Sequence, residues 1–174
     1  MKENNKNNYI ELLNTNNPII IKETLKKIQI DGDIDIIPSL FELLVKYKNE
    51  EIGNTTLNIL KDIKLSKFKN YILDNINNPK YSKIKTNLLS ICWESSIDFS
   101  DNLNIFAEII IEDDFINSFE AYTIIKNLNY DSNIDSTKEV IEYFKSNIQS
   151  INSQKKELIY DLIKFLEKQI DIQI

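Results

Sequence analysis

The sequence predicts an all-α protein, built as a short right-handed stack of helical hairpins. Only two Gly and three Pro occur among the 174 residues, which leaves little material for the tight turns of a β-sandwich or for nucleotide-binding loops. Apolar residues recur at the i, i+3, i+4, i+7 spacing of helices that bury one face. This pattern returns at intervals of 31 to 37 residues, marked by Leu25, Leu57, Leu88, Tyr122 and Ile159.

The first half of the chain is predicted to hold six helices. Residues 1–8 are polar and are expected to be disordered or frayed, and residues 31–33, Asp-Gly-Asp, form a clear turn. Helix starts are marked by a capping side chain close to a proline, at Asn17-Pro18, at Asn78-Pro79 and at Asp35 ahead of Pro38. The predicted spans are 9–14, 18–29, 36–47, 50–64, 66–77 and 79–95.

The second half is predicted to hold four helices. Ser100 marks the first start, and residues 131–133, Asp-Ser-Asn, form the clearest turn. The predicted spans are 101–112, 114–129, 135–150 and 153–170. Each hairpin of such a stack contacts only its neighbours, and terminal helices act as caps. We therefore expect four to five hairpins in a single domain over residues 1–174.

Composition excludes several kinds of chemistry. All 21 basic residues are Lys, and the chain contains neither Arg nor His. The commonest general base near neutral pH is thus missing, and so is the planar guanidinium that binds phosphate in a bidentate manner. The single cysteine, Cys92, has no second cysteine for a disulfide and no His to activate it.

Charge and hydropathy indicate a compartment and a class of partner. The net charge of −6 opposes binding to phosphate backbones, so nucleic acid is not an expected partner. No apolar run approaches the length of a membrane span, and the polar N-terminus does not resemble a signal peptide. We expect a cytoplasmic monomer that binds another protein, uses no cofactor and has no membrane attachment.

One stretch carries a resemblance to a known family. Residues 33–44, with Pro38 in the first turn of a helix, followed by residues 49–52 and the pair Leu57 and Leu60, resemble a HEAT repeat. At Gly53 the family usually carries a basic residue. Residues 90–100 and 111–115 resemble small bacterial HEAT-like proteins. The resemblance implies an armadillo-like α-solenoid, and it implies binding rather than catalysis.

Acidic residues form two patterns that admit different interpretations. Asp31, Asp33, Asp35 and Glu42 have the carboxylate spacing of a calcium-binding loop, and Asp131, Asn133, Asp135 and Glu142 repeat it. Both segments lack the glycine that such a loop needs at its sixth position, so N-capping carboxylates are the favoured interpretation. Glu112, Asp113 and Asp114 form the densest acidic cluster, which is also expected to cap a helix.

Aromatic residues near the edges of the predicted buried stripes are candidates for partner binding. Trp93 follows Leu89 by four residues, so it packs in the core or lies exposed as an interface residue. In solenoids the second helices of the hairpins line one extended face. On that face we expect the partner-binding residues Lys61, Trp93, Glu94, Asp98, Tyr122 and Lys126.

The function predicted from the sequence is a non-enzymatic module for protein binding or scaffolding. A carboxylate-based or Ser/Lys-based enzyme is one alternative, and a calcium-binding helical protein is another. The enzyme is disfavoured by the missing His, Arg and Gly-rich loops. No residue is predicted to be catalytic or to bind a metal.

Overall fold

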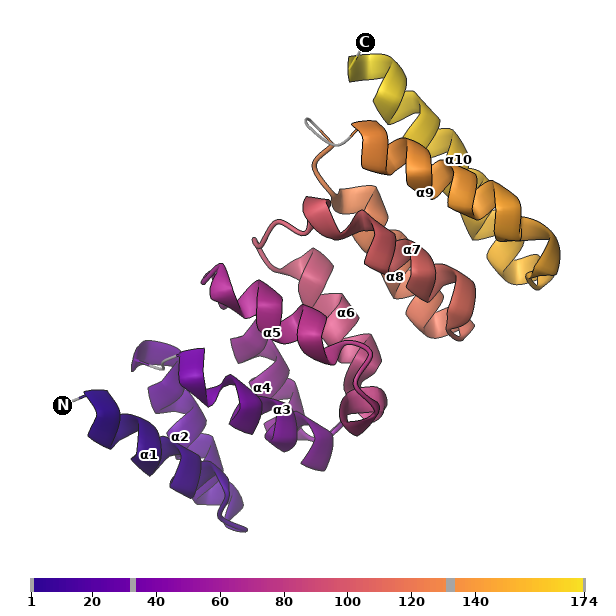
Figure 1. Cartoon of the computed structure of the whole chain (residues 1–174). Coiled ribbons are helices and arrows are strands. Elements are labelled where there is room, and N and C mark those ends of the chain that lie inside the picture. The colour runs from indigo at the N-terminus through magenta and orange to yellow at the C-terminus, as the bar shows by residue number, and fades with distance from the viewer. Residues whose placement is uncertain (1, 32–33, 131–133, 174) are drawn as a thin grey trace. The chain divides into compact units, whose positions relative to one another are not determined.

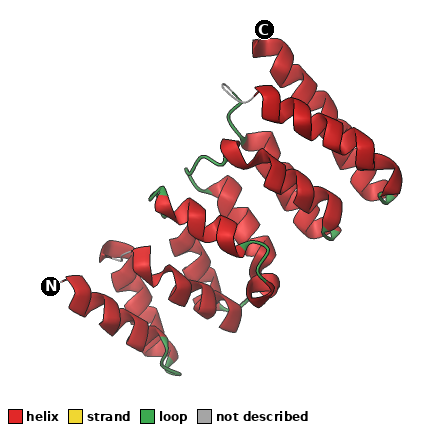
Figure 2. Ribbon diagram, in the orientation of Figure 1, coloured by secondary structure: helices red, strands yellow, loops and turns green. Residues whose placement is uncertain are grey.

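The described part of the structure is entirely helical. A computed structural model describes residues 2–31, 34–130 and 134–173, and within these ranges it contains ten α-helices, four 3₁₀ segments and no strand (Figure 2). The all-α prediction is therefore confirmed. The predicted turns at 31–33 and 131–133 lie largely outside the described residues.

The chain falls into two compact units, Met1–Ile97 and Asp98–Ile174. Helices α1 to α6 lie in the first unit, and helices α7 to α10 lie in the second (Figure 1). The sequence predicted one domain over residues 1–174 and gave no boundary at Ile97. The handedness and continuity of a single stack stay predictions.

Unit 1 contains every helix predicted for the first half of the chain, with some changes at the ends. The helix α1 begins seven residues before its predicted start, and the predicted helix over 79–95 is divided into a 3₁₀ segment and an α-helix. In that segment the Tyr81 N–H bonds the carbonyl of Asn78, three residues back, at 2.9 Å. The elements are α1 Lys2–Leu13, α2 Pro18–Asp31, η1 Ile34–Ile36, α3 Ile37–Lys46, α4 Glu51–Lys61, α5 Lys67–Asn75, η2 Pro79–Ile84 and α6 Lys85–Glu94.

Two of the three predicted helix starts in unit 1 have the predicted cap. The side-chain oxygens of Asn17 and Asn78 each accept a hydrogen bond, at 3.0 Å, from the backbone N–H two residues later. Asp35 instead lies inside η1, and α3 follows Ile36, which provides no side-chain cap. A short 3₁₀ turn therefore precedes α3, whereas the sequence predicted that the carboxylate of Asp35 would cap this helix.

The core of unit 1 is built around three aromatic rings. Phe41 packs edge-on against Tyr81, with ring centroids 5.5 Å apart, and lies 6.4 Å from Phe68. Both Phe side chains are fully buried. The Tyr81 hydroxyl donates to Glu42 Oε1 at 3.0 Å, which satisfies its polar end at the surface.

The turn between α3 and α4 is closed by backbone groups. The Tyr47 carbonyl accepts a hydrogen bond from the Glu50 N–H at 3.0 Å, and Asn49 adopts a left-handed conformation with φ of 66°. A Cβ atom at Gly53 would lie 2.1 Å from the Tyr47 carbonyl oxygen. The basic residue that HEAT repeats usually carry at this position could not fit here, because the backbone of the turn occupies the space.

Unit 2 contains all four helices predicted for the second half of the chain. The elements are η3 Ser100–Asn102, α7 Leu103–Glu112, α8 Phe115–Asn127, α9 Ile134–Asn147, η4 Ile148–Ser150 and α10 Ser153–Gln173. Figure 1 shows α7 beside α8 and α9 beside α10, and α8 also packs against α10 as α7 does against α9. The core includes Phe99, edge-on to Phe106 at 6.1 Å, and the buried Phe144.

The turn between α7 and α8 is closed by side chains. Lys155 of α10 is only 4% exposed, and its Nζ donates to the carbonyls of Ile111 and Asp113, both at 2.7 Å. The buried Ser118 hydroxyl lies 2.8 Å from the Asp114 carbonyl. Asp114 Oδ1 accepts from the N–H three residues later at 2.9 Å, so the prediction that this acidic cluster caps a helix is confirmed for Asp114.

Candidate functional site

Helix α8 exposes a strip of aromatic side chains. Phe115 stacks on Phe119 with centroids 6.3 Å apart, and Phe119 stacks on Tyr122 at 5.9 Å with the rings only 17° from parallel. Phe115 is 40% exposed and Phe119 is 48% exposed. Ile116 beside them is exposed as well. We call Phe115, Ile116, Phe119 and Tyr122 the aromatic strip.

The C-terminal end of the aromatic strip is anchored to α10. The Tyr122 hydroxyl donates to Asp161 Oδ2 at 2.7 Å, and Lys126 Nζ lies 3.1 Å from the same oxygen. Lys126 Nζ also lies 4.1 Å from the ring centroid of Phe165. The structure thus brings together Tyr122 and Lys126, two of the predicted binding residues, through a carboxylate that the sequence did not point to.

These contacts change the acidity of two groups. Burial, followed by the hydrogen bond to Asp161, raises the pKa of Tyr122 to about 12. The hydrogen bond from Tyr122 and then that from Lys126 lower the pKa of Asp161 below its ordinary value of 3.8. At neutral pH the phenol is therefore a hydrogen-bond donor and the carboxylate is ionised, so the arrangement positions the ring rather than activating the phenol as a base.

Three of the predicted residues lie in unit 1. Trp93 on α6 is 38% exposed, so it stands at the edge of the buried stripe formed by its neighbours on the helix. Lys61 at the end of α4 and Glu94 at the end of α6 form an ion pair at 2.7 Å. Each unit thus has an aromatic ring at the surface near an ion pair between neighbouring helices: Trp93, which is exposed, in unit 1 and Tyr122, which is half-buried, in unit 2.

Asp98, the sixth predicted residue, has a local structural role. Its two carboxylate oxygens accept hydrogen bonds from the backbone N–H and the hydroxyl of Ser100, at 2.9 and 3.0 Å. Asp98 therefore organises the entry into η3, and the helix-start role predicted for Ser100 is shared with it.

The predicted calcium loops cannot be compared with the structure in full. Asp33, Asp131 and Asn133 lie outside the described residues, and Asp31 is described only as the end of α2. Among the residues that the structure describes, no group of three or more Cys, Asp and Glu side chains is arranged to hold a metal ion. The capping interpretation stays a prediction for the residues outside the described ranges, whereas Asp35 lies inside η1 and Asp135 lies in the first turn of α9.

Two buried features of unit 1 lack the polar groups of a reaction site. Burial raises the pKa of the Cys92 thiol, which lies 3.4 Å from the Leu88 carbonyl, so the thiol stays protonated.

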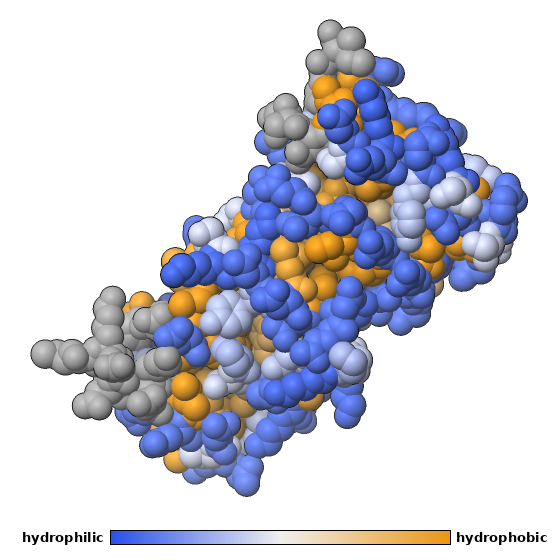
Figure 3. Space-filling model, viewed as in Figure 1, coloured by the Kyte–Doolittle hydropathy of each residue, from blue (hydrophilic) through white to orange (hydrophobic). Residues whose placement is uncertain are grey.

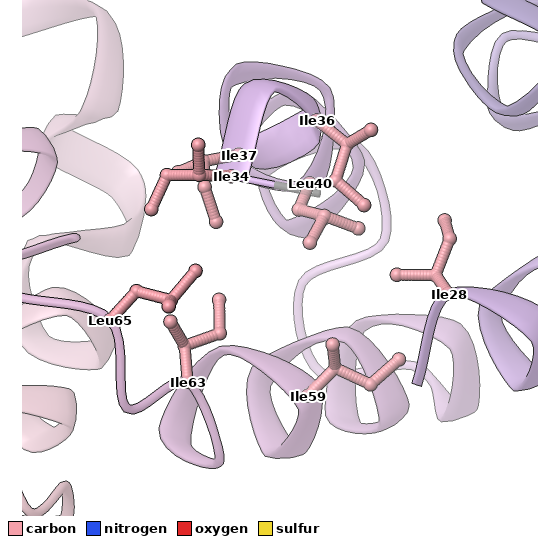
Figure 4. A pocket seen from close by; sticks show the side chains of 8 residues that line it. All are labelled: Ile28, Ile34, Ile36, Ile37, Leu40, Ile59, Ile63 and Leu65. Carbon is pink, nitrogen blue, oxygen red and sulfur yellow. The ribbon is translucent and has the colours of Figure 1, made fainter. Parts of the chain in front are cut away.

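A small pocket of about 60 Å³ is lined by eight aliphatic side chains (Figure 4). They converge from α2, η1, α3, α4 and the turn that follows α4. Ligand pockets are usually several times larger, at roughly 300 to 1,000 Å³.

Phe115, Ile116 and Phe119 are surface residues that sequence reasoning missed. Helix α8 has apolar residues on two faces, and the face that is buried carries Ser118, Ala121, Ile124 and Ile125. Large aromatic side chains are normally assigned to the core. The signal that could have located the strip is the i, i+4, i+7 spacing of the three rings beside a second face of small and aliphatic residues.

No helix among the described residues combines the length and the apolar character that crossing a bilayer requires.

Comparison with known proteins does not identify a family for this chain. No protein-family model, curated protein or solved structure matches the chain.

Proposed function

We propose that this chain is a non-catalytic protein-binding module of HEAT-like, right-handed solenoid type, and that the aromatic strip on α8 is its main contact surface. The observation that carries the proposal is the surface stack of the exposed Phe115 and Phe119 on the half-buried Tyr122. Clustered exposed apolar residues on a protein surface usually mark an interaction site, and aromatic residues supply much of the binding energy in interfaces.

Contacts between alternate helices support the solenoid part of the proposal. In unit 1, α2 packs against α4 and α4 packs against α6, with the ion pair of Lys22 and Glu51 (2.5 Å) joining the first two. In unit 2, α8 packs against α10 and α7 against α9. Helices two positions apart therefore lie side by side in each unit, which is the arrangement of stacked hairpins.

The surroundings of the strip favour a protein as the partner. Lys126 and Asp161 lie beside the rings, and charged groups at the rim of an interface influence orientation and association rate. Trp93, with the Lys61–Glu94 ion pair, provides a contact of similar composition in unit 1. The buried Cys92 thiol and the missing His support a role without catalysis. In this proposal the protein is a cytoplasmic monomer without a cofactor.

Substitution of the strip tests the proposal. The double variant Phe115→Ala, Phe119→Ala should lose capture of the protein that the wild type captures from a native lysate, because most of the exposed ring area is removed. Its melting temperature should stay within a few degrees, since both side chains lie at the surface and are 40% and 48% exposed.

The matched control is Ile19→Ala, which truncates an exposed apolar side chain on α2. It should leave capture unchanged. Equal capture by the strip variant and the wild type would contradict the assignment of the strip, and a wild-type protein that captures nothing beyond the bead background would contradict the binding function. Trp93→Ala then asks whether unit 1 contributes to the same partner.

A further inference from the structure

A groove with an acidic rim lies between α7 and α9 of unit 2. It has a volume of about 350 Å³, and the described residues that line it include the carboxylates of Asp101, Glu108 and Glu139 and no basic side chain. The buried residues Leu103, Ala107 and Val140 form an apolar floor. Figure 3, which views unit 2 from the side of α7 and α9, shows apolar surface between hydrophilic side chains there.

Two of the carboxylates at this groove have no ion-pair partner among the described residues. Glu108 on α7 and Glu139 on α9 make no ion pair in the part of the chain that the structure describes. Elsewhere in unit 2 comparable carboxylates are engaged: Asp114 caps α8, and Asp161 binds Tyr122 and Lys126. Glu108 and Glu139 are also exposed, so among the described residues these two carboxylates face solvent as acceptors without a cation.

The sequence around the groove concentrates negative charge. Residues 86–125 contain eight Asp and Glu and no Lys, and residues 98–174 together carry 15 acidic and 7 basic residues. Residues 1–97, by contrast, carry 12 acidic and 14 basic residues. The net charge is therefore −8 for unit 2 and +2 for unit 1, and a cationic partner would be attracted to unit 2 specifically.

Tyr143 gives the groove a third property. It lines the groove from α9 and is half-buried, and the nearby carboxylates of Glu108 and Glu112 add to burial in raising the pKa of its hydroxyl. An aromatic face beside carboxylates suits a Lys or Arg side chain, because the aliphatic stem packs on apolar surface while the cationic end meets both the ring and the charges.

We propose that the groove between α7 and α9 binds a basic, lysine-rich or arginine-rich segment of a partner protein. The rim carboxylates receive the cationic ends, and the floor receives the aliphatic stems. A metal ion is a poorer occupant, since no three carboxylates among the described residues converge as ligands. The groove shares no residue with the aromatic strip on α8, so this proposal does not depend on the function assigned to the strip.

Binding of a fluorescently labelled lysine-rich peptide to the full chain, measured by anisotropy at physiological salt, tests the proposal. A counterpart peptide with norleucine at every lysine position reports apolar binding alone. The wild type should bind the lysine peptide at least about tenfold more tightly than its counterpart, and the double variant Glu108→Gln, Glu139→Gln should weaken lysine-peptide binding by about tenfold. Both exposed substitutions should leave the melting temperature nearly unchanged.

The control is the double variant Glu157→Gln, Asp171→Asn, which removes the same charge from exposed positions on α10 outside the groove. It should change affinity by less than about twofold. Equal weakening in both double variants would show general attraction to an acidic unit and overturn the proposal, as would equal binding of the two peptides.

Two further measurements distinguish other occupants. Spermine, a small polycation, should displace the peptide only weakly; displacement at concentrations below the Kd of the peptide would assign the groove to a small polycation instead. Sedimentation of the protein alone should show no self-association. A dimer that Glu108→Gln, Glu139→Gln abolishes would assign the groove to a second copy of this chain.

Discussion

The hairpin turns α3–α4 and α7–α8 solve the same problem by different means. Each must satisfy the carbonyls at the end of one helix and the amides at the start of the next. The α3–α4 turn does so with backbone groups, through Tyr47 and Asn49, and leaves room only for Gly53 on the following helix. The α7–α8 turn uses the side chains of Asp114 and Lys155.

The difference teaches what each turn depends on. The α3–α4 turn depends on the absence of a side chain, and its contacts lie within a few residues of one another. The α7–α8 turn depends on an ammonium group that α10 provides from more than 40 residues further along the chain. We therefore expect the α3–α4 turn to be destabilised by a side chain added at Gly53. The α7–α8 turn should be destabilised when the ammonium group of Lys155, which is distant in sequence, is removed.

The largest effect should come from adding one methyl group to the backbone-closed turn. Gly53→Ala places a Cβ where the Tyr47 carbonyl oxygen lies 2.1 Å away, and that oxygen belongs to rigid backbone. We expect a loss of about 4 kcal/mol in the free energy of unfolding, at the upper end for a single substitution. Urea denaturation measures it. Asn54→Ala, the exposed neighbour, is the control and should change stability by less than about 1 kcal/mol; a wild-type-like Gly53→Ala would contradict the close approach.

Removing the ammonium group should be the next largest change. Lys155→Met keeps most of the side-chain volume but leaves the carbonyls of Ile111 and Asp113 without their donor. We expect a loss of about 3 kcal/mol in stability. Hydrogen exchange should show faster exchange of the amides at the end of α7 and the start of α8. Lys156→Met is the matched control. An equal loss of stability in both variants would contradict the claim that the α7–α8 turn depends on the ammonium group of Lys155.

A smaller effect is expected at Asn49. Its left-handed conformation costs a residue with a Cβ about 1 kcal/mol or more, which Asn offsets in part and Ala does not. Asn49→Ala should therefore lower stability by about 1 kcal/mol, whereas Asn49→Gly should be nearly neutral. Thermal melting of the pair measures the difference. Two variants of equal stability would argue against the positive φ.

The smallest effect concerns pH, and it should be confined to the side-chain contacts of unit 2. The pKa of Asp161 is lower in the folded state than its ordinary 3.8, so the carboxylate stabilises the fold above about pH 4. This stabilisation is lost as the pH falls through the folded pKa. Asp161→Asn should therefore flatten part of the decline in melting temperature below about pH 4, while Glu157→Gln should not. A decline identical in all three proteins would show that Asp161 contributes nothing.

Helix positions could be predicted from the sequence because the physical cause of each helix is local. The apolar spacing that placed a helix near 18–29 or 101–112 reflects one buried face, and that face is buried in the structure. The 3₁₀ segment Pro79–Ile84 could not be distinguished from an α-helix, because both have nearly the same apolar spacing over one or two turns. The division at Ile97 was not predicted, although the balance of charge changes there, from 14 basic and 12 acidic residues before it to 7 basic and 15 acidic residues after it.

The candidate site was less accessible to prediction. Tyr122 and Lys126 could be proposed because they are four residues apart on one helix. Their shared partner Asp161 lies 35 residues after Lys126, and nothing local links the two. Phe119 was missed because a buried and an exposed ring look alike in a sequence, whereas the groove between α7 and α9 exists only through the packing of two helices.

The hydrogen bonds of Lys155 to a turn more than 40 residues earlier have a consequence for folding during synthesis. During synthesis both helices of the α7–α8 hairpin emerge from the ribosome before Lys155 emerges, so water must solvate the carbonyls of Ile111 and Asp113 until α10 follows. The nascent hairpin is therefore incomplete until α10 has emerged. Over that interval it exposes the surface that α9 and α10 later cover, and this is when we expect chaperones to recognise it.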